Sequence, residues 1–199
     1  MSKKLRKEPI FIAPDIFGWI DEQYNPHIFD DVNKVELNAY NAFDKITIYE
    51  RQVKEWFLNP AIKLLKYNNR NKGFIVLMIC LSYIEGVEQF KVGSSSDGRS
   101  KLFFRNSMNR IYPNMFNDNQ LNNFYSQARC GLFHNGMVQG KIVINNSFER
   151  SIEFLDYTDI KISPSKFLKD IILDFENYIA ELKNNEISRN NFSNMYSNI

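Results

Sequence analysis

The sequence predicts a mainly α protein, in which a bundle of helices carries a small β-hairpin before its final helix and an irregular arm at its N-terminus. Apolar residues recur every three or four positions along several segments, as they do on the buried face of a helix. The segment 72–91 is apolar on almost every side, which is typical of the central helix of a bundle. The 199 residues, 44% of them hydrophobic, are enough for one domain with a substantial core.

The irregular arm is expected over residues 1–43, because prolines interrupt this segment and no apolar period is sustained. A short strand is expected near residues 10–13, and the apolar side chains of the arm should pack it onto the helical body. The helical domain should then span residues 44–184.

The first two helices follow from apolar periodicity. One is expected over residues 44–67, with Asp44 as its N-cap and an interruption at Pro60. The central helix follows over residues 72–91. A β-strand over residues 74–81 is the competing interpretation, which the segment's length and the polar pattern after it disfavour.

A flexible connector rich in glycine and serine, residues 93–98, is expected to follow the central helix. A short helix should then end before Pro113. The next helix, capped by Asn117 or Asp118, should end near Gly136.

The last third of the chain is expected to contain the hairpin and the final helix. The apolar pattern changes to a strand-like one, which predicts a hairpin over about residues 141–160. Ser163 followed by Pro164 indicates the start of the final helix, since a hydroxyl residue at the N-cap and proline at the first position favour helix entry. A flexible tail is expected over residues 185–199.

Composition excludes several classes of protein. The net charge of +2 argues against a histone-like nucleic-acid binder, although a local basic groove remains open. With two cysteines and two histidines and no cluster of them, the sequence predicts no metal site, no cofactor and no disulfide scaffold. It contains no signal peptide and no uninterrupted apolar stretch of about 18 residues, so we expect a cytoplasmic protein without a membrane span.

The segment from Arg129 to His134, Arg-Cys-Gly-Leu-Phe-His, is the one that suggests chemistry. Arginine is costly to bury unpaired, so Arg129 should face solvent, an interface or an anion. His134 lies near a helix C-terminus, where the helix dipole favours a protonated imidazole. A histidine that exchanges protons and a guanidinium that binds phosphoryl oxygens are together a plausible minimal set of groups for cleaving RNA without metal.

The spacing of this pair poses a geometric difficulty. Positions five apart on a straight helix are rotated by roughly 140°. The length of the Arg129 side chain, a helix distorted at Gly131, or a symmetric dimer that brings Arg129 and His134 from two chains into one cleft would each reduce the gap.

The segment 129–136 resembles the Arg-x4–6-His motif of HEPN domains, and in particular a group of bacterial HEPN-like proteins with an Arg-Cys-Gly-Leu-x-His helix. Motif detail is confined to residues 125–136, while the architecture of residues 45–183 is similar overall. The resemblance implies a helical bundle, often a homodimer, with arginine and histidine facing a cleft at the interface. Many members are metal-independent ribonucleases of toxin–antitoxin, phage-defence or RNA-processing systems; others bind RNA, nucleotides or a partner protein without catalysis.

By this resemblance Arg129 would stabilise the phosphate and His134 would be the acid–base group, with Glu85, Cys130 and Asn135 in supporting positions. Active members commonly have Asn, Asp or His after the arginine, whereas this chain has a weakly hydrogen-bonding thiol at Cys130. The resemblance also implies RNA, a second copy of the chain or an antitoxin as partners.

Plainer interpretations stay open for the same residues. His134 would be bonded to a backbone carbonyl, Arg129 would form a salt bridge with Glu85 or Glu88, and Cys130 would be a small buried apolar residue. A helical dimer without a ligand would then be the outcome.

Overall fold

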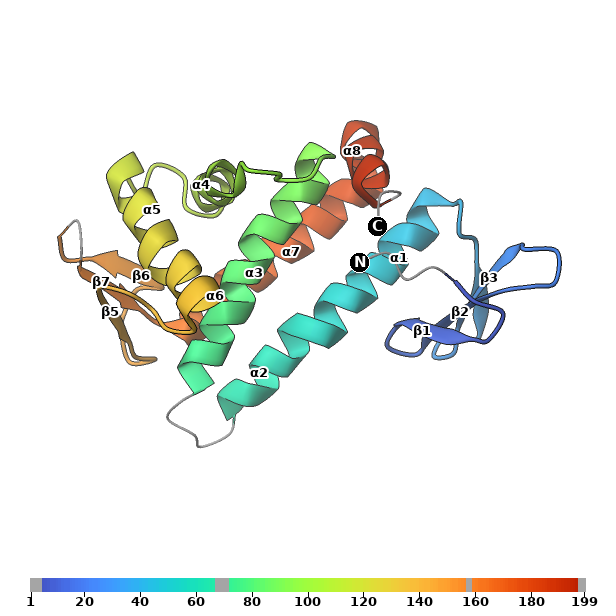
Figure 1. Cartoon of the computed structure of the whole chain (residues 1–199), viewed down its shortest axis with the longest axis horizontal. Coiled ribbons are helices and arrows are strands. Elements are labelled where there is room, and N and C mark those ends of the chain that lie inside the picture. Colours follow the sequence, from blue (N-terminus) through green and yellow to red (C-terminus); the bar gives the residue numbers. More distant parts are fainter. Residues whose placement is uncertain (1–4, 67–71, 157–158, 197–199) are drawn as a thin grey trace.

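A computed structural model describes residues 5–66, 72–156 and 159–196. The chain is mainly helical, as predicted, and it carries a small β-sheet at each end of the helical body (Figure 1). The first four strands of the chain form one sheet, and the last three strands form the other. Along the chain, the order is therefore the first sheet, a first group of helices, the second sheet and the last helices.

Residues 10–37 form a four-stranded antiparallel sheet, so the prediction of an irregular arm was wrong, although a strand does occupy residues 10–13. The strands pair in sequence order and are β1 (Ile10–Ala13), β2 (Ile16–Ile20), β3 (Pro26–Asp30) and β4 (Val35–Leu37). The prolines do not break the sheet, because Pro14 lies in a turn and Pro26 is the first residue of its strand. The left-handed conformations of the turns fall on Asp15, Tyr24 and Lys34, so the usual glycine signal is missing.

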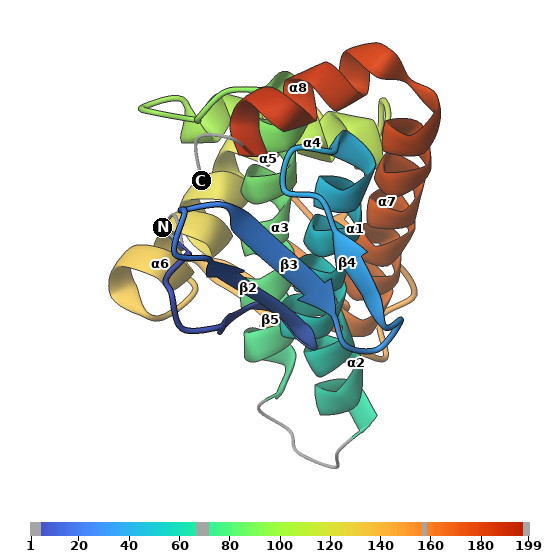
Figure 2. The same ribbon diagram turned by 90° about the vertical axis from the view of Figure 1, so that its right-hand side faces the viewer.

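The first sheet is attached to the helical body through α1 (Ala42–Val53), which lies behind it in Figure 2. Buried Ile48 of α1 packs against the apolar face of the sheet. Arg51 of α1 donates to the buried carboxylate of Asp30 at 3.0 Å, and the Gln52 amide donates to the Ile12 carbonyl at 2.6 Å. The sheet and α1 therefore share both a small core and specific polar contacts.

The first helical run continues from α1 through the π-helical segment η1 (Lys54–Leu58) into α2 (Asn59–Lys66). The N-cap of α1 is Asn41, not Asp44, because the Asn41 side chain accepts from the amides of residues 43 and 44. The helix does not break at Pro60. A proline cannot donate to the preceding turn, and the widened π-helical turn before it is a known way for a helix to accommodate such a defect.

The central helix is α3 (Lys72–Val92), which confirms the helical interpretation over the strand. It packs against the helices that follow it in the chain, which are α4 (Ser100–Ile111), α7 (Pro164–Asn184) and α8 (Glu186–Tyr196). Within the described part of the chain, only α3 has the length and composition to cross a membrane. Because 44% of its most apolar window is buried in the protein, and core helices pass the same test, this is weak support for a span.

The helix that carries the Arg-Cys-Gly motif has three parts. It begins with α5 (Asp118–Phe124), continues through the π-helical η2 (Tyr125–Cys130) and ends with α6 (Gly131–Asn135). Asn117 caps it in a reciprocal box with Gln120, and Gly136 ends it in a left-handed conformation, as the sequence predicted.

The segment after this helix forms a three-stranded mixed sheet, so the hairpin prediction was too simple. Its strands are β5 (Lys141–Ile144), β6 (Ile152–Phe154) and β7 (Asp159–Ile162), in the order β5-β7-β6. Only β6 and β7 pair antiparallel; β5 runs parallel to β7. Pairing between non-consecutive strands depends on long-range contacts, which local periodicity does not reveal.

The final predicted helix is α7, which starts after Ser163 as expected, but a further helix follows it. The predicted flexible tail was wrong for residues 186–196, which form α8, while residues 197–199 lie outside the described chain. Phe192 of α8 is completely buried and stacks against Phe90 of α3. One buried aromatic ring therefore anchors a segment whose composition is otherwise polar.

Candidate functional site

The guanidinium of Arg129 is held against the central helix. Its Nε and Nη2 atoms donate to Oε2 of Glu85 at 3.1 and 2.7 Å. The two side chains are only 19% and 14% exposed, so the pair is well shielded from water. The plainer interpretation of Arg129, a salt bridge that ties two helices, is confirmed with Glu85 as the partner.

Two aromatic rings flank the same guanidinium. The Arg129 Cζ lies 5.7 Å from the ring centre of Tyr125 and 5.3 Å from that of Phe133. The three residues are spaced by four along the η2–α6 helix and so line one face of it. The rings and the carboxylate together restrict the rotamers of Arg129, while its Nη1 nitrogen has no hydrogen-bond partner among the residues described.

Glu85 is itself held by the connector between α3 and α4. The Ser96 hydroxyl donates to the second carboxylate oxygen of Glu85 at 3.1 Å, and the Ser96 amide donates to Gln89 at 3.1 Å. Ser96 is buried, so this part of the predicted flexible connector is docked on the central helix. Arg129, Glu85 and Ser96 therefore form a chain of contacts, of which the sequence indicated only the first pair.

His134 lies at the open end of the helix. It is exposed to solvent, and within residues 5–66, 72–156 and 159–196 it has no hydrogen-bond or ion-pair partner. The plainer interpretation, a histidine bonded to a backbone carbonyl, is therefore wrong for this structure. Asn135, the next residue, is exposed as well.

No hydrogen bond or ion pair joins Arg129 to His134 in the described chain. The widened π-helical turn ends at Cys130, and the segment from Gly131 to His134 is α-helical, so the expected rotation of roughly 140° between the two residues is largely retained. Arg129 is directed to α3, and an offset of this size places His134 on another side of the helix.

Cys130 lies between the two motif residues along the helix and is half-buried, not fully buried as the plainer interpretation predicted. The pKa of the neighbouring Tyr125 hydroxyl is raised, first by burial and next by the charge that the Cys130 thiolate would carry. The phenol and the thiol are therefore close neighbours beside the Arg129–Glu85 pair.

Gly131 allows the chain after the motif to fold back onto the helix. A Cβ on Gly131 would lie 2.7 Å from the carbonyl oxygen of Met137 and 2.9 Å from the amide nitrogen of Gln139. The returning segment is bonded there, since the Gln139 amide donates to the Gln127 carbonyl at 2.8 Å. The glycine of the motif is thus required for packing, not for backbone conformation.

Gly131→Ala should destabilise the protein by about 1–3 kcal/mol, because its methyl group meets backbone atoms that cannot rotate away. Gly86→Ala in α3 is the matched control: a Cβ there meets nothing within 4 Å, so the higher helix propensity of alanine should stabilise by about 0.5–1 kcal/mol. Urea unfolding of both variants measures the two changes in the free energy of unfolding, which should have opposite signs. Equal effects would show that residues 137–139 do not pack on Gly131.

A second polar cluster was missed by the sequence analysis. Arg110 of α4 contacts the carboxylates of Glu88 in α3 and Asp174 in α7, and its Nη2 also donates to the Ser107 hydroxyl at 2.9 Å. The Tyr83 hydroxyl donates to Asp174 at 2.8 Å. The signal in the sequence was an acidic residue, Glu88, within the mostly apolar central helix. These groups lie between α3, α4 and α7 and join the three helices through the core.

The described residues contain no group of three or more His, Cys, Asp or Glu side chains arranged to hold a metal ion. No family model, curated protein or solved structure matches this chain.

Proposed function

We propose that this protein is a metal-independent endoribonuclease of the HEPN type, acting in the cytoplasm in phage defence or as a toxin. The observation that carries the proposal is the combination of an oriented arginine and a free histidine at one helix end: Arg129 is held by Glu85, and His134 is exposed without a partner in the described chain. An imidazole that makes no structural contact is free to act as an acid–base group.

The proposed chemistry assigns one role to each side chain. The His134 imidazole accepts the proton of a ribose 2′-hydroxyl, whose oxygen attacks the adjacent phosphorus to form a 2′,3′-cyclic phosphate. The bond from phosphorus to the 5′-oxygen of the next nucleotide breaks, and that oxygen takes a proton from water and leaves as a hydroxyl. Arg129 stabilises the negative charge on the phosphoryl oxygens through the N–H groups that Glu85 does not occupy. Glu85 is a positioning residue, because it restricts the rotamer of the guanidinium without reaching the substrate.

A homodimer is part of this proposal, because Arg129 and His134 of one chain do not converge. A two-fold axis beside the helix would place the exposed His134 of one copy near Arg129 of the other. Phe133 is 42% and Met137 is 62% exposed beside the motif, and apolar side chains left in solvent next to a functional segment favour an interface there.

Cleavage of total RNA by the purified protein, in the presence of EDTA, tests the proposal. Replacing His134 by alanine should lower the rate about 100-fold, since that is the typical loss when a general acid–base group is removed. The Arg129→Ala/His134→Ala protein should be no faster. His27→Ala is the matched control, because His27 lies in β3 of the first sheet, bonded to Asp21 and Glu36. If wild type and the double variant are equally inactive, the protein is not a ribonuclease.

A second candidate function is a non-catalytic HEPN-like module that binds RNA or a partner protein such as an antitoxin. It is favoured by the two N–H groups of Arg129 that Glu85 already occupies and by Cys130, where active members have an amide, a carboxylate or an imidazole. Expression toxicity discriminates between the two: growth inhibition relieved by His134→Ala supports the enzyme, whereas a harmless protein that still binds RNA supports the module.

A further inference from the structure

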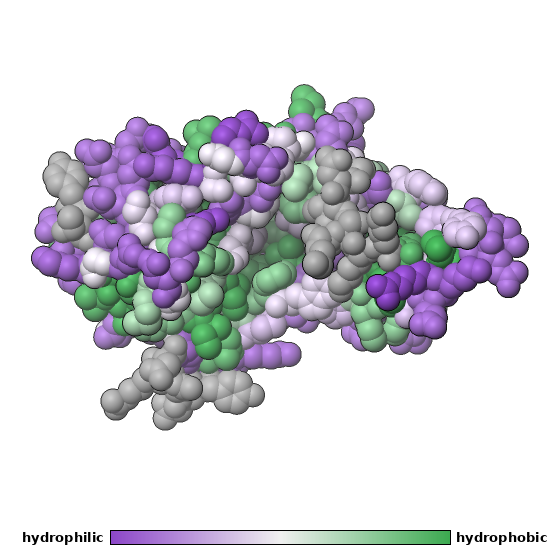
Figure 3. Space-filling model, viewed as in Figure 1, coloured by the Kyte–Doolittle hydropathy of each residue, from purple (hydrophilic) through white to green (hydrophobic). Residues whose placement is uncertain are grey.

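A cavity of about 580 Å³ lies on a different side of the central helix from the Arg129 site. It is enclosed by the first sheet, α1 and η1 on one side and by α3 and α8 on the other. It opens on the face shown in Figure 3, where a hollow with apolar walls lies between α3 and α1. Its walls are mainly aliphatic and aromatic and include Ile48, Val53, Trp56, Phe57, Val87 and Phe90. A cavity of this size and lining is typical of a small-molecule site.

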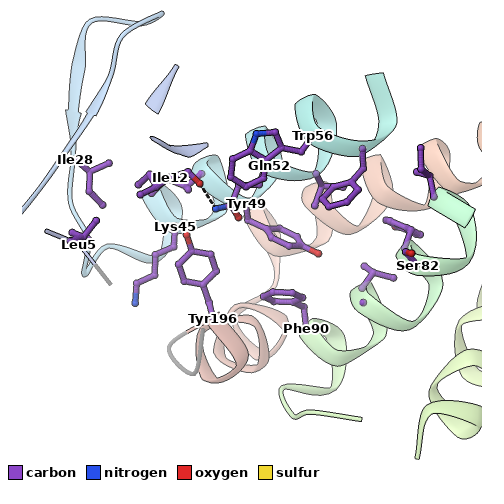
Figure 4. Close-up of a pocket in the computed structure, with 18 residues that line it drawn as sticks. Leu5, Ile12, Ile28, Lys45, Tyr49, Gln52, Trp56, Ser82, Phe90 and Tyr196 are labelled. Atoms are coloured by element: carbon purple, nitrogen blue, oxygen red, sulfur yellow. Dashed lines mark hydrogen bonds between the residues drawn. The ribbon is translucent and has the colours of Figure 1, made fainter. Parts of the chain in front are cut away.

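One hydroxyl in the wall lacks a hydrogen-bond partner among the described residues. Tyr49 of α1 is 6% exposed, and its ring extends across the cavity toward α3 (Figure 4). The ring packs against Phe90, Phe175 and Phe192, yet its hydroxyl has no hydrogen bond in the part of the chain that the structure describes. Burial raises the pKa of Tyr49, so the phenol keeps its proton and can donate it to an acceptor. The hydroxyl is not fully buried and lines the cavity, so it can donate to an acceptor that a ligand brings there.

A glycine of α3 keeps the opposite wall open. Gly86 lies in the interior of a regular helix, where glycine is less favourable than alanine by about 1 kcal/mol. Its backbone has no left-handed conformation, and an added Cβ would meet no atom within 4 Å. Neither packing nor conformation therefore requires glycine here, in contrast to Gly131. The missing side chain leaves room inside the cavity.

Charge plays little part in the centre of the cavity. Figure 4 shows the Lys45 ammonium directed away from the Tyr49 ring, toward the rim. The Gln52 amide is occupied by the Ile12 carbonyl. From these contacts we infer that the cavity binds an uncharged, largely apolar small molecule with one oxygen acceptor. This molecule fills the open space beside the Cα atom of Gly86, and its oxygen accepts a hydrogen bond from the Tyr49 hydroxyl.

The test uses two probes that differ in one acceptor, benzophenone and diphenylmethane, titrated against the full chain by saturation-transfer NMR. Wild type should bind benzophenone about 2- to 10-fold more tightly, which is the usual net contribution of one hydrogen bond. Tyr49→Phe, which keeps the ring, should bind the two probes equally. Tyr178→Phe is the matched control: the Tyr178 hydroxyl also lacks a partner among the described residues, but Tyr178 does not line the cavity, so the preference should persist.

Filling the cavity gives an independent readout. Gly86→Leu should weaken binding of both probes at least about 10-fold while the helical circular dichroism is retained, because leucine occupies the open space and is a good helix former. Ser82→Leu, also on the cavity wall, should have the same effect if Gly86→Leu does not fold. The inference is overturned if wild type binds neither probe saturably, binds both equally, or if the filled variants bind as well as wild type.

Discussion

Arg110→Met is expected to destabilise the protein by about 3–5 kcal/mol, as large an effect as any single substitution in this chain should have. The guanidinium of Arg110 lies between the carboxylates of Glu88 and Asp174, whose side chains are each 10% exposed. Without it, two like charges remain in the core, where water cannot solvate them. Urea unfolding at neutral pH, followed by circular dichroism, gives the free energy of unfolding directly.

A matched control separates the buried network from ordinary surface charge. Lys183 pairs with Glu50 at 3.2 Å, with a side chain that is 52% exposed, and Lys183→Met should change the free energy of unfolding by at most about 1 kcal/mol. Adding Glu88→Gln and Asp174→Asn to Arg110→Met should recover at least half of the loss, because the stranded charges are then gone. A triple variant no more stable than Arg110→Met would contradict the electrostatic origin of the loss and assign it to packing of the arginine stem.

Asp30→Ala should produce the second large loss, again about 3–5 kcal/mol, by detaching the first sheet from the helical body. The Asp30 carboxylate is fully buried and accepts from Arg51, from the Asn33 side chain and from the amides of Val32 and Asn33. Removing it leaves two backbone amides without an acceptor and the Arg51 guanidinium with only its bond to the Pro14 carbonyl and no carboxylate beside it. Thermal unfolding of wild type and variant measures the loss. Asp31→Ala, next in sequence but in an exposed pair with Lys34, should have an effect within about 1 kcal/mol.

The contribution of Asp30 should depend on pH in a defined direction. Burial acts to raise the pKa of Asp30, but the hydrogen bonds from Asn33 and the charge of Arg51 prevail, and the folded pKa is lowered. A lowered folded pKa gives stability that is present above the unfolded value of about 3.9 and is lost as pH falls through the folded pKa. The difference in stability between wild type and Asp30→Ala should therefore narrow as pH is lowered from about 5 toward about 2. A difference that widens on acidification would contradict this assignment.

Local signals in the sequence were reliable where one short segment decides the structure. The box formed by Asn117 and Gln120, the glycine at 136 and the proline at 164 each act within one helical turn, and all three helix ends lie where they were expected. The helical interpretation of residues 72–91 was also confirmed, because a long segment that is apolar on almost all sides has few alternatives. The N-cap of α1 was missed by three positions, since Asp44 and Asn41 are both suitable cap residues and only the fold chooses between them.

The candidate site was anticipated in part. An arginine among apolar residues needs an anionic partner, and the sequence offered two glutamates, Glu85 and Glu88. A salt bridge from Arg129 could therefore be predicted, but not that its partner would be Glu85. Glu88 is not the partner because it already forms an ion pair with Arg110, which lies on another helix, α4. Ser96 and the cavity wall at Gly86 gave no signal, because serine is common in loops and a glycine within a helix does not by itself indicate a cavity.

The sequence by itself determined the helical class, the helix ends near Asn117, Gly136 and Pro164, and the segment that carries the motif, because propensity, capping and periodicity act over a few neighbouring residues. Only the tertiary structure decided that residues 10–37 form a sheet, that β5 pairs in parallel with β7, that Glu85 holds Arg129 while His134 stays exposed, and that Tyr49 and Gly86 face one cavity. Each of these depends on residues far apart in the chain. Which of several chemically equivalent partners a side chain meets is set by the packing of the whole core.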